Sequence, residues 1–188
     1  MNLLAGDIGG TKTLLSIYSF KESPKKIFYK YYASAEWESF ESILLNFINE
    51  LPNNISMPQY GCIGVAGPVF KGKAKITNLG WDLDSEKLSF LSRIEKIELV
   101  NDLAVLLFGI PFFKKSQYEI IQGDLNSHNN CDNQSVAIIG AGTGLGMARG
   151  LIKNKNIFVS PSEGGHGEFS PRNEDEWRLV NWIKTNLN

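Results

Sequence analysis

The chain has 188 residues, of which 43 % are hydrophobic and 21 % are charged, with 19 basic and 20 acidic side chains. This composition is typical of a folded globular protein and argues against a disordered, collagen-like or coiled-coil chain. A formal net charge of −1 argues against a nucleic acid or an anionic membrane as partner, because both attract a basic surface. At about 100–200 residues per domain, the length allows one domain or one and a half.

We find no secretory signal and no segment that is long and apolar enough to span a bilayer. The longest apolar run, residues 103–113, is interrupted by Gly109 and Pro111, whereas a spanning helix needs about 20 apolar residues. Cys62 lies in an apolar run and Cys131 in a polar one, and two such unmatched thiols suit a reducing compartment. We therefore expect a cytoplasmic protein.

The hydrophobic pattern predicts an alternation of strands and helices. Apolar runs indicate strands over residues 3–8, 13–20, 26–33, 60–65, 97–100, 136–139, 147–152 and 157–159. Helical spacing indicates helices over residues 34–51, 85–92 with Asp84 as cap, 103–108 and 174–187. Residues 71–75, 77–82 and 122–134 are expected to be turns or loops. This order of elements predicts an α/β fold whose first two strands form a hairpin around Gly9 and Gly10.

Glycine is the one unusual count, at 18. More than half of these residues fall in three short clusters, which are Gly6, Gly9 and Gly10; Gly140, Gly142, Gly144 and Gly146; and Gly164, Gly165 and Gly167. Because glycine permits close approach to the backbone, the clusters suggest that something packs against bare backbone.

Neither of the first two clusters matches a common nucleotide motif. The first lacks the Walker A spacing and the second lacks the dinucleotide fingerprint. What remains is a pair of strand–turn–strand units, in which Thr11 and Thr143 stand beside backbone N–H groups. Such turns form concavities that bind anions, although two plain hairpins are the alternative.

Four motifs carry a family resemblance, and they occur in a fixed order along the whole chain. They are Asp7-Ile8-Gly9-Gly10-Thr11-Lys12, Val100-Asn101-Asp102, Gly140-Ala141-Gly142-Thr143-Gly144-Leu145-Gly146 and Ser162-Glu163-Gly164-Gly165-His166. Residues 76–81 and 168–172 extend the match. The ordered set resembles the bacterial-type glucokinases of the sugar kinase/Hsp70/actin superfamily.

The resemblance implies a fold of two domains with a cleft between them, each built on a ribonuclease-H-like (actin-like ATPase) mixed sheet. Residues 1–111 would form the small N-terminal domain, and residues 112–188 would form the first part of the large domain. The implied reaction is ATP-dependent phosphorylation of glucose at the 6-hydroxyl group, with ATP and Mg²⁺.

The resemblance also implies a role for each matched residue. Asp102 would be the catalytic base that takes the proton of the attacking sugar hydroxyl. The sugar would be bound by Asn101, Asp102, Glu163 and His166. ATP would be bound by Asp7, Gly9, Gly10, Thr11, Lys12, Gly142 and Thr143, with Asp7 also holding Mg²⁺ through water.

Some of these residues have simpler interpretations when they are judged without the family. Asp102 suits a helix N-cap, and Asn101 and Asp7 suit turns. Glu163 and His166 have the spacing of half a metal site, although the two glycines between them argue against the helix that such a site needs. Lys12 suits a solvated position. Asn78 and Trp81 are expected to shape the edge of the cleft, with a core position as an equal alternative for Trp81.

Members of the family normally have a much longer chain. The resemblance implies that a second sugar-binding glutamate, the adenosine-binding segment and the terminal helix are missing. We therefore expect impaired activity, and we expect Trp177, Val180 and Ile183 to be exposed or used for association, for example in a homo-oligomer. The alternatives are a non-catalytic relic or interaction module of the same fold, and a kinase for another hexose.

Overall fold

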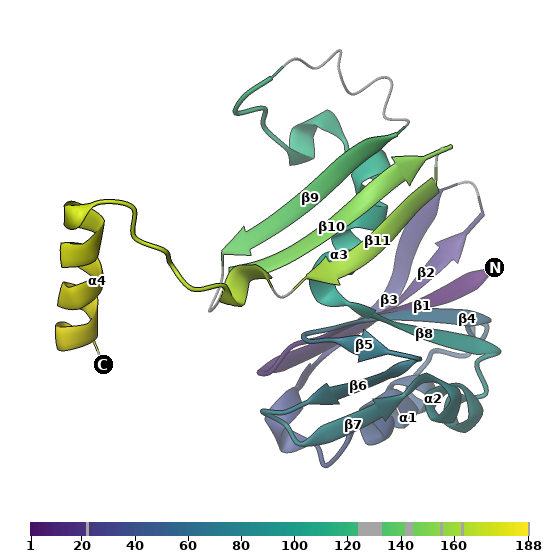
Figure 1. Cartoon of the computed structure of the whole chain (residues 1–188). Helices are drawn as coiled ribbons and strands as arrows, with labels where there is room; N and C mark the ends of the chain where they lie inside the picture. Colours follow the sequence, from purple (N-terminus) through teal and green to yellow (C-terminus); the bar gives the residue numbers. More distant parts are fainter. Residues whose placement is uncertain (22, 124–132, 142–144, 155, 163, 188) are drawn as a thin grey trace.

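The computed structural model describes residues 1–21, 23–123, 133–141, 145–154, 156–162 and 164–187 (Figure 1). Its largest element is a five-stranded sheet in the order β3-β2-β1-β4-β8. Its strands are β1 (Asn2–Ile8), β2 (Lys12–Phe20), β3 (Pro24–Ala33), β4 (Tyr60–Val65) and β8 (Lys96–Asn101). β1, β2 and β3 pair antiparallel, whereas β1, β4 and β8 run parallel. The five predicted strands of this region and the first hairpin are confirmed.

Parallel pairing brings the carboxyl ends of β1, β4 and β8 to one edge of the sheet. Ile8 lies beside Val65, and Val65 lies beside Asn101. The turn that follows β1 and the helix that follows β8 therefore start from neighbouring points. This is the edge at which open α/β sheets bind their ligands.

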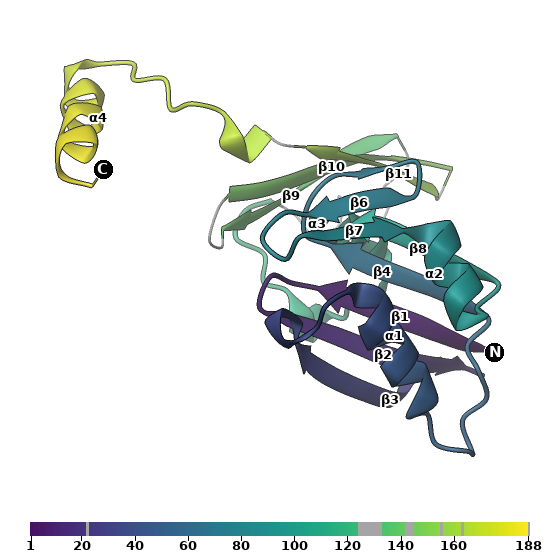
Figure 2. The same ribbon diagram turned by 90° about the horizontal axis from the view of Figure 1, so that it is seen from below.

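One face of the sheet is covered by α1 (Phe40–Asn49) and α2 (Ser85–Ser92), as Figure 2 shows from below. Alternate residues of the strands face this helical layer, and Leu4, Ile8, Leu15 and Ile17 are at most 1 % exposed. Phe40, Ile43, Leu44, Phe47, Ile63, Val65 and Leu88 belong to the same buried core. Burying each large side chain contributes about 1.5–3 kcal/mol.

The first helix begins later than the apolar spacing predicts. Ser34–Glu36 form a single 3₁₀ turn, η1, and α1 begins at Phe40. Its cap is Ser39, whose hydroxyl accepts a hydrogen bond from the Ser42 N–H at 3.3 Å. The prediction of a helix from Ser34 is wrong because the buried Ser34 hydroxyl donates instead to the Gly9 carbonyl.

A three-stranded antiparallel sheet occupies residues that were expected to be turns and loops. It consists of β5 (Val69–Phe70), β6 (Lys73–Ile76) and β7 (Trp81–Asp84). Lys71 and Gly72, with φ angles of 50° and 72°, make the tight turn between β5 and β6. The hydrophobic pattern does not reveal β6 and β7, because charged residues alternate there with the buried Ile76, Trp81 and Leu83.

The C-terminal part of the chain builds a separate layer. α3 (Asp102–Gly109) lies against an antiparallel sheet in the order β11-β10-β9 (Figure 1). The strands are β9 (Gln134–Ala141), β10 (Leu145–Lys153) and β11 (Asn156–Ser162), and the short 3₁₀ turns are η2 (Ile110–Phe112), η3 (Lys115–Gln117) and η5 (Gly164–His166). Ala104, Leu107 and Ala148 form the buried contact between helix and sheet.

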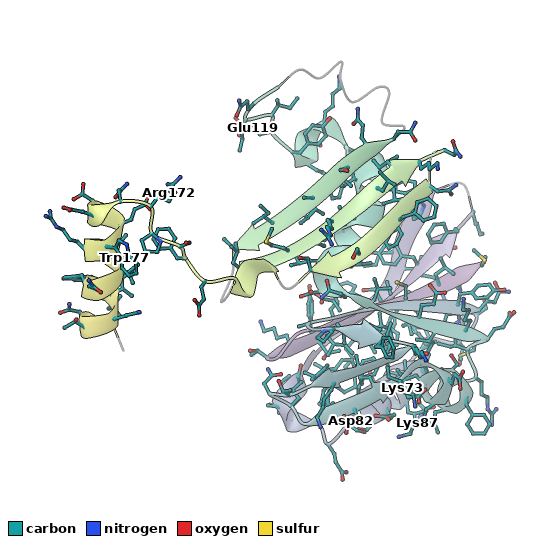
Figure 3. The ribbon with its side chains drawn as sticks, in the orientation of Figure 1. Lys73, Asp82, Lys87, Glu119, Arg172 and Trp177 are labelled. Atoms are coloured by element: carbon teal, nitrogen blue, oxygen red, sulfur yellow. The ribbon has the colours of Figure 1, made fainter. Side chains whose placement is uncertain are left out.

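The last helix, α4 (Glu174–Asn186), stands apart from the rest of the molecule (Figures 1 and 2). None of its residues is buried, and Trp177, labelled in Figure 3, and Ile183 are 54 % and 42 % exposed. The expected exposure of Trp177 and Ile183 is confirmed, whereas Val180 is half-buried. None of the helices within the described ranges has the length and apolar composition needed to cross a membrane.

Candidate active site

Two carboxylate side chains, Asp7 and Asp102, lie near the edge where β1, β4 and β8 end, close enough for the charge of one to act on the other. Asp7 is paired with Gly64 across β1 and β4, and a Cβ on Gly64 would lie 3.8 Å from the Cα of Asp102. Desolvation by the surrounding protein raises the pKa of Asp7, and the negative charge of Asp102 raises it further. A cation bound between the two side chains would relieve both effects.

This carboxylate pair fits a Mg²⁺ ion, which uses one or two carboxylates together with water and phosphate oxygens. The residues that the structure describes contain no group of three or more His, Cys, Asp or Glu side chains that could hold a metal by themselves. Any divalent cation at Asp7 would therefore need ligands from water or from a substrate.

The first glycine turn leaves β1 beside this pair. It is closed by the Gly9 N–H, which donates to the Lys12 carbonyl at 2.9 Å. The N–H groups of Gly10 and Thr11 donate to no acceptor within the described part of the chain. A turn whose N–H groups are left unpaired is suited to bind an anion such as a phosphate.

Gly10 is a position where another side chain approaches the backbone closely. A Cβ there would lie 2.1 Å from the Nδ2 atom of Asn78, which stands in the link between β6 and β7. Asn78 therefore packs on the turn, in keeping with its expected place at the edge of the site.

Asn101 caps the helix that carries Asp102. Its Oδ1 accepts from the N–H groups of Leu103 at 3.2 Å and Ala104 at 3.0 Å, and its Nδ2 donates to the Gly67 carbonyl at 3.1 Å. The capping role considered for Asp102 thus belongs to Asn101. Among the described residues, one of the two amide hydrogens of Asn101 has no acceptor, so it is free to bind a ligand.

Asp102 is the first residue of α3, and its Oδ1 accepts from the Leu103 N–H at 2.8 Å. The other carboxylate oxygen has no protein donor among the residues that the structure describes. Its side chain is partly exposed. One oxygen is therefore held by the helix start while the other is available to a substrate hydroxyl.

Two glycines of the second cluster pack against the first turn of α3. Gly142 and Thr143 lie outside the described residues, but Gly140 and Gly146 flank them at the ends of β9 and β10. A Cβ would lie 3.1 Å from Leu103 at Gly140 and 2.2 Å from Leu103 at Gly146. The group that packs against bare backbone at these two positions is therefore a side chain next to Asp102, a contact that sequence analysis missed.

The third cluster lies against the same hairpin. A Cβ on Gly165 would lie 1.6 Å from the carbonyl oxygen of Leu145, so η5 rests directly on the start of β10. Glu163 and the side chain of His166 are outside the described residues. Ser162, the residue before Glu163, pairs with Met147 in β10, and η5 begins at Gly164.

The chain is similar to known proteins over nearly its whole length. A family model described as Glucokinase matches residues 4–188. A glucokinase of Nostoc punctiforme is 38 % identical over 183 residues, which make up 96 % of this chain and 52 % of that protein. The chain therefore spans about half the length of such relatives.

Solved structures show the same fold. The glucokinase of an Antarctic psychrotroph matches with a TM-score of 0.77 and 24 % identity, over 99 % of this chain and 57 % of that chain. A ROK family glucokinase from Streptomyces griseus, in complex with glucose and AMPPNP, matches with a TM-score of 0.52 and 20 % identity, over 84 % and 46 %. The expected actin-like ATPase fold of the sugar kinases is confirmed.

Proposed function

Since the chain belongs to the glucokinase family, we propose that it takes part in ATP-dependent phosphorylation of glucose at the 6-hydroxyl group. The observation that carries the proposal is the meeting of Asp7, the Gly9–Lys12 turn and Asp102 at one sheet edge. Phosphoryl transfer asks a protein mainly for positioning and charge stabilisation. This edge offers a base, a cation ligand and unpaired N–H groups within one small region.

In this proposal Asp102 is the general base. Its free carboxylate oxygen accepts the proton of the 6-hydroxyl group while the sugar oxygen forms its bond to the γ-phosphorus and the bond to ADP breaks. Asn101 offers its remaining amide hydrogen to a sugar hydroxyl, and Glu163 and His166 supply further sugar contacts. The glucose bound to the Streptomyces griseus protein supports this choice of substrate.

The phosphates of ATP are assigned to the two glycine turns. Gly9, Gly10, Thr11 and Lys12 form one side, and Gly142 and Thr143 form the other. Asp7 would hold Mg²⁺ through water, and the ion would neutralise charge on the phosphates. The AMPPNP bound to the Streptomyces griseus protein supports ATP as the phosphate donor.

The division into two domains is part of the same proposal. Residues 1–111 form the small domain and residues 112–188 the first part of the large one. It is supported by the separation of β1–β4 and β8 from β9–β11, which belong to different sheets. α3 itself packs against the second sheet and so connects the two parts.

The test uses a fusion of residues 1–188 to the remaining half of the Nostoc punctiforme glucokinase. We expect the fusion to form glucose 6-phosphate from glucose and MgATP, at a rate in the usual kinase range of about 1–100 s⁻¹. Asp102→Asn should lower kcat at least about 100-fold, the contribution of a general base. Asp82→Asn, the same change at an exposed position of β7, is the matched control and should leave kcat unaltered.

Two results would contradict the proposal. One is a folded fusion that does not phosphorylate glucose but does phosphorylate mannose or an amino sugar, which would point to another hexose kinase. The other is activity that survives Asp102→Asn. The 188-residue chain alone should turn over well below about 1 s⁻¹, the low end of the kinase range, and a faster rate would refute the expected impairment.

A further inference from the structure

Ser34 stands directly behind the first glycine turn. It follows the last residue of β3, and Ala33 pairs with Lys12 at the start of β2. Ser34 is 0 % exposed, as is Thr13, the next residue of β2. A buried hydroxyl needs hydrogen-bond partners, because water cannot reach it.

Ser34 contacts the turn at two carbonyl groups. Its N–H donates to the Thr11 carbonyl at 3.0 Å, and its hydroxyl donates to the Gly9 carbonyl at 3.0 Å. Its Oγ also lies 3.0 Å from the Oγ1 of Thr13. Each hydroxyl has a single hydrogen, and that of Ser34 is used by Gly9, so Thr13 must be the donor to Ser34.

The bond to Gly9 determines where the next N–H points. The Gly9 carbonyl and the Gly10 N–H belong to one planar, trans peptide unit, in which the two groups point in opposite directions. When the carbonyl is held toward the buried Ser34 hydroxyl, the Gly10 N–H is turned away from the protein core. That N–H is one of the two that have no acceptor among the described residues.

We propose that Ser34 is a positioning residue for nucleotide binding, which orients the Gly9–Gly10 peptide so that the Gly10 N–H faces a polyphosphate. The Thr13 hydroxyl donates to Ser34 Oγ and so holds the Ser34 side chain in place. The Ser34 N–H donates to the Thr11 carbonyl and so holds the other end of the turn. The inference rests on the proposed function, since that function supplies the polyphosphate. Ser34 itself touches no reacting atom in this account.

A purely structural role for Ser34 has to be separated from this positioning role. Ser92 is a suitable matched control, because it is 2 % exposed and its hydroxyl donates to the Leu88 carbonyl at 2.7 Å. It therefore has the same kind of buried bond to a backbone carbonyl, but at the end of α2. Ser34→Ala and Ser92→Ala should both lower the melting temperature, and only Ser34→Ala should alter the turn.

The experiment is ¹⁵N NMR of the 188-residue chain with magnesium tripolyphosphate as the probe. In the wild-type chain we expect a saturable shift of the Gly10 amide signal. Ser34→Ala should raise the dissociation constant for tripolyphosphate about five- to tenfold, the loss of affinity expected for one hydrogen bond. It should also speed hydrogen exchange of the Gly9 N–H without ligand, and Ser92→Ala should change neither quantity.

A further pair of variants tests the direction of the bonds. Thr13→Val removes the supporting hydroxyl but leaves the bond from Ser34 to Gly9, so it should weaken tripolyphosphate binding less than Ser34→Ala does. Ser34→Cys keeps the volume of the side chain and supplies only a weak donor. Ser34→Cys should therefore also weaken tripolyphosphate binding. It takes the place of Ser34→Ala if Ser34→Ala does not fold.

The outcomes separate the two proposals. If the wild-type chain binds tripolyphosphate and the Ser34 variants bind it within twofold of wild type, the role of Ser34 is overturned and the phosphate site stands. If Ser92→Ala weakens binding as much as Ser34→Ala, the effect is one of general stability and the role of Ser34 is again overturned. If the wild-type chain binds no tripolyphosphate, the phosphate turn itself is refuted, and the role of Ser34 falls with it.

Discussion

The sheet built by β1–β4 and β8 and the sheet built by β9–β11 differ in how they are covered. The first encloses a large core beneath α1 and α2, in which Phe40, Phe47 and Leu88 are 0 % exposed. In the described part of the second sheet, the buried cluster against α3 is small and consists of Ala104, Leu107 and Ala148. α4, whose apolar side chains are all at least partly exposed, adds no cover to the second sheet.

Because of this difference in burial, the two halves of the candidate site lie on sheets of unequal stability. Asp7 and the Gly9–Lys12 turn lie at the edge of the well-packed sheet, whereas Gly140, Gly146 and Gly165 lie in or against the thinly covered one. Local stability follows the amount of buried apolar contact. The first half of the candidate site should therefore keep its geometry under conditions that loosen the other half.

The largest expected effect is that of Phe47→Ala. Phe47 is fully buried in α1, with its ring centroid 5.3 Å from that of Phe28. The truncation should lower the free energy of unfolding by about 3–5 kcal/mol. Phe158→Ala in β11, where the side chain is 60 % exposed, is the matched control and should cost under about 1 kcal/mol. Urea unfolding measures both, and equal losses would remove the contrast between the two sheets.

Gly165→Ala should have the next largest effect. The new Cβ would overlap the Leu145 carbonyl oxygen, so η5 must move away from β10. A cost of about 1–3 kcal/mol is expected for such overpacking. At Gly164 a Cβ would lie 3.2 Å from the nearest side-chain atom, so Gly164→Ala should be milder. Thermal melts that rank the two variants in the opposite order would contradict the placement of η5.

Asp7→Asn should raise stability in a pH-dependent way. Desolvation and the charge of Asp102 raise the pKa of Asp7 in the folded chain. Between the unfolded and folded pKa values the folded state holds more protons, so the free energy of unfolding falls as pH rises. The variant should therefore be more stable than wild type at pH 7, and the difference should shrink toward pH 4, near the ordinary pKa of about 3.9.

Urea titrations at several pH values measure this difference. Asp82→Asn on the exposed face of β7 is the control, and its stability relative to wild type should not follow the same trend. A stability difference for Asp7→Asn that grows toward low pH would contradict a raised pKa of Asp7 in the folded chain.

The smallest effect is expected in α4. Trp182 is 57 % exposed, so Trp182→Ala should change the free energy of unfolding by less than about 0.5 kcal/mol. Trp81→Ala is the comparison, because Trp81 is only 4 % exposed. This truncation should lower the free energy of unfolding by about 3–5 kcal/mol. A large loss for Trp182→Ala would mean that α4 packs on the body of the chain.

The parts of the fold that follow from local pattern were predictable from the sequence. The strands of both larger sheets were identified from apolar runs, and Asp84 caps α2 as expected, with its Oδ1 accepting from Glu86 at 3.0 Å and Lys87 at 3.3 Å. Each of these features depends on residues that are neighbours in the chain. The family motifs then marked the strand ends at Asp7 and Asn101.

The features that sequence analysis missed depend on contacts between distant residues. Ser34 has the local appearance of a helix start, but its hydroxyl donates to the carbonyl of Gly9 in the turn between β1 and β2. Asn and Asp are about equally good caps, so only the structure assigns the cap to Asn101. The contact of Leu103 with Gly140 and Gly146 joins segments that lie far apart in the sequence.

The central claim is that Asp7, the first glycine turn and Asp102 form one nucleotide site. Titration of the ¹⁵N-labelled chain with MnATP tests it directly, because the paramagnetic ion broadens the amide signals that lie near it. We predict that the signals of Asp7, Gly10 and Asp102 broaden first, that those of α4 stay sharp, and that Asp7→Asn weakens the broadening. Broadening that begins elsewhere, or that is unaffected by Asp7→Asn, would contradict the claim.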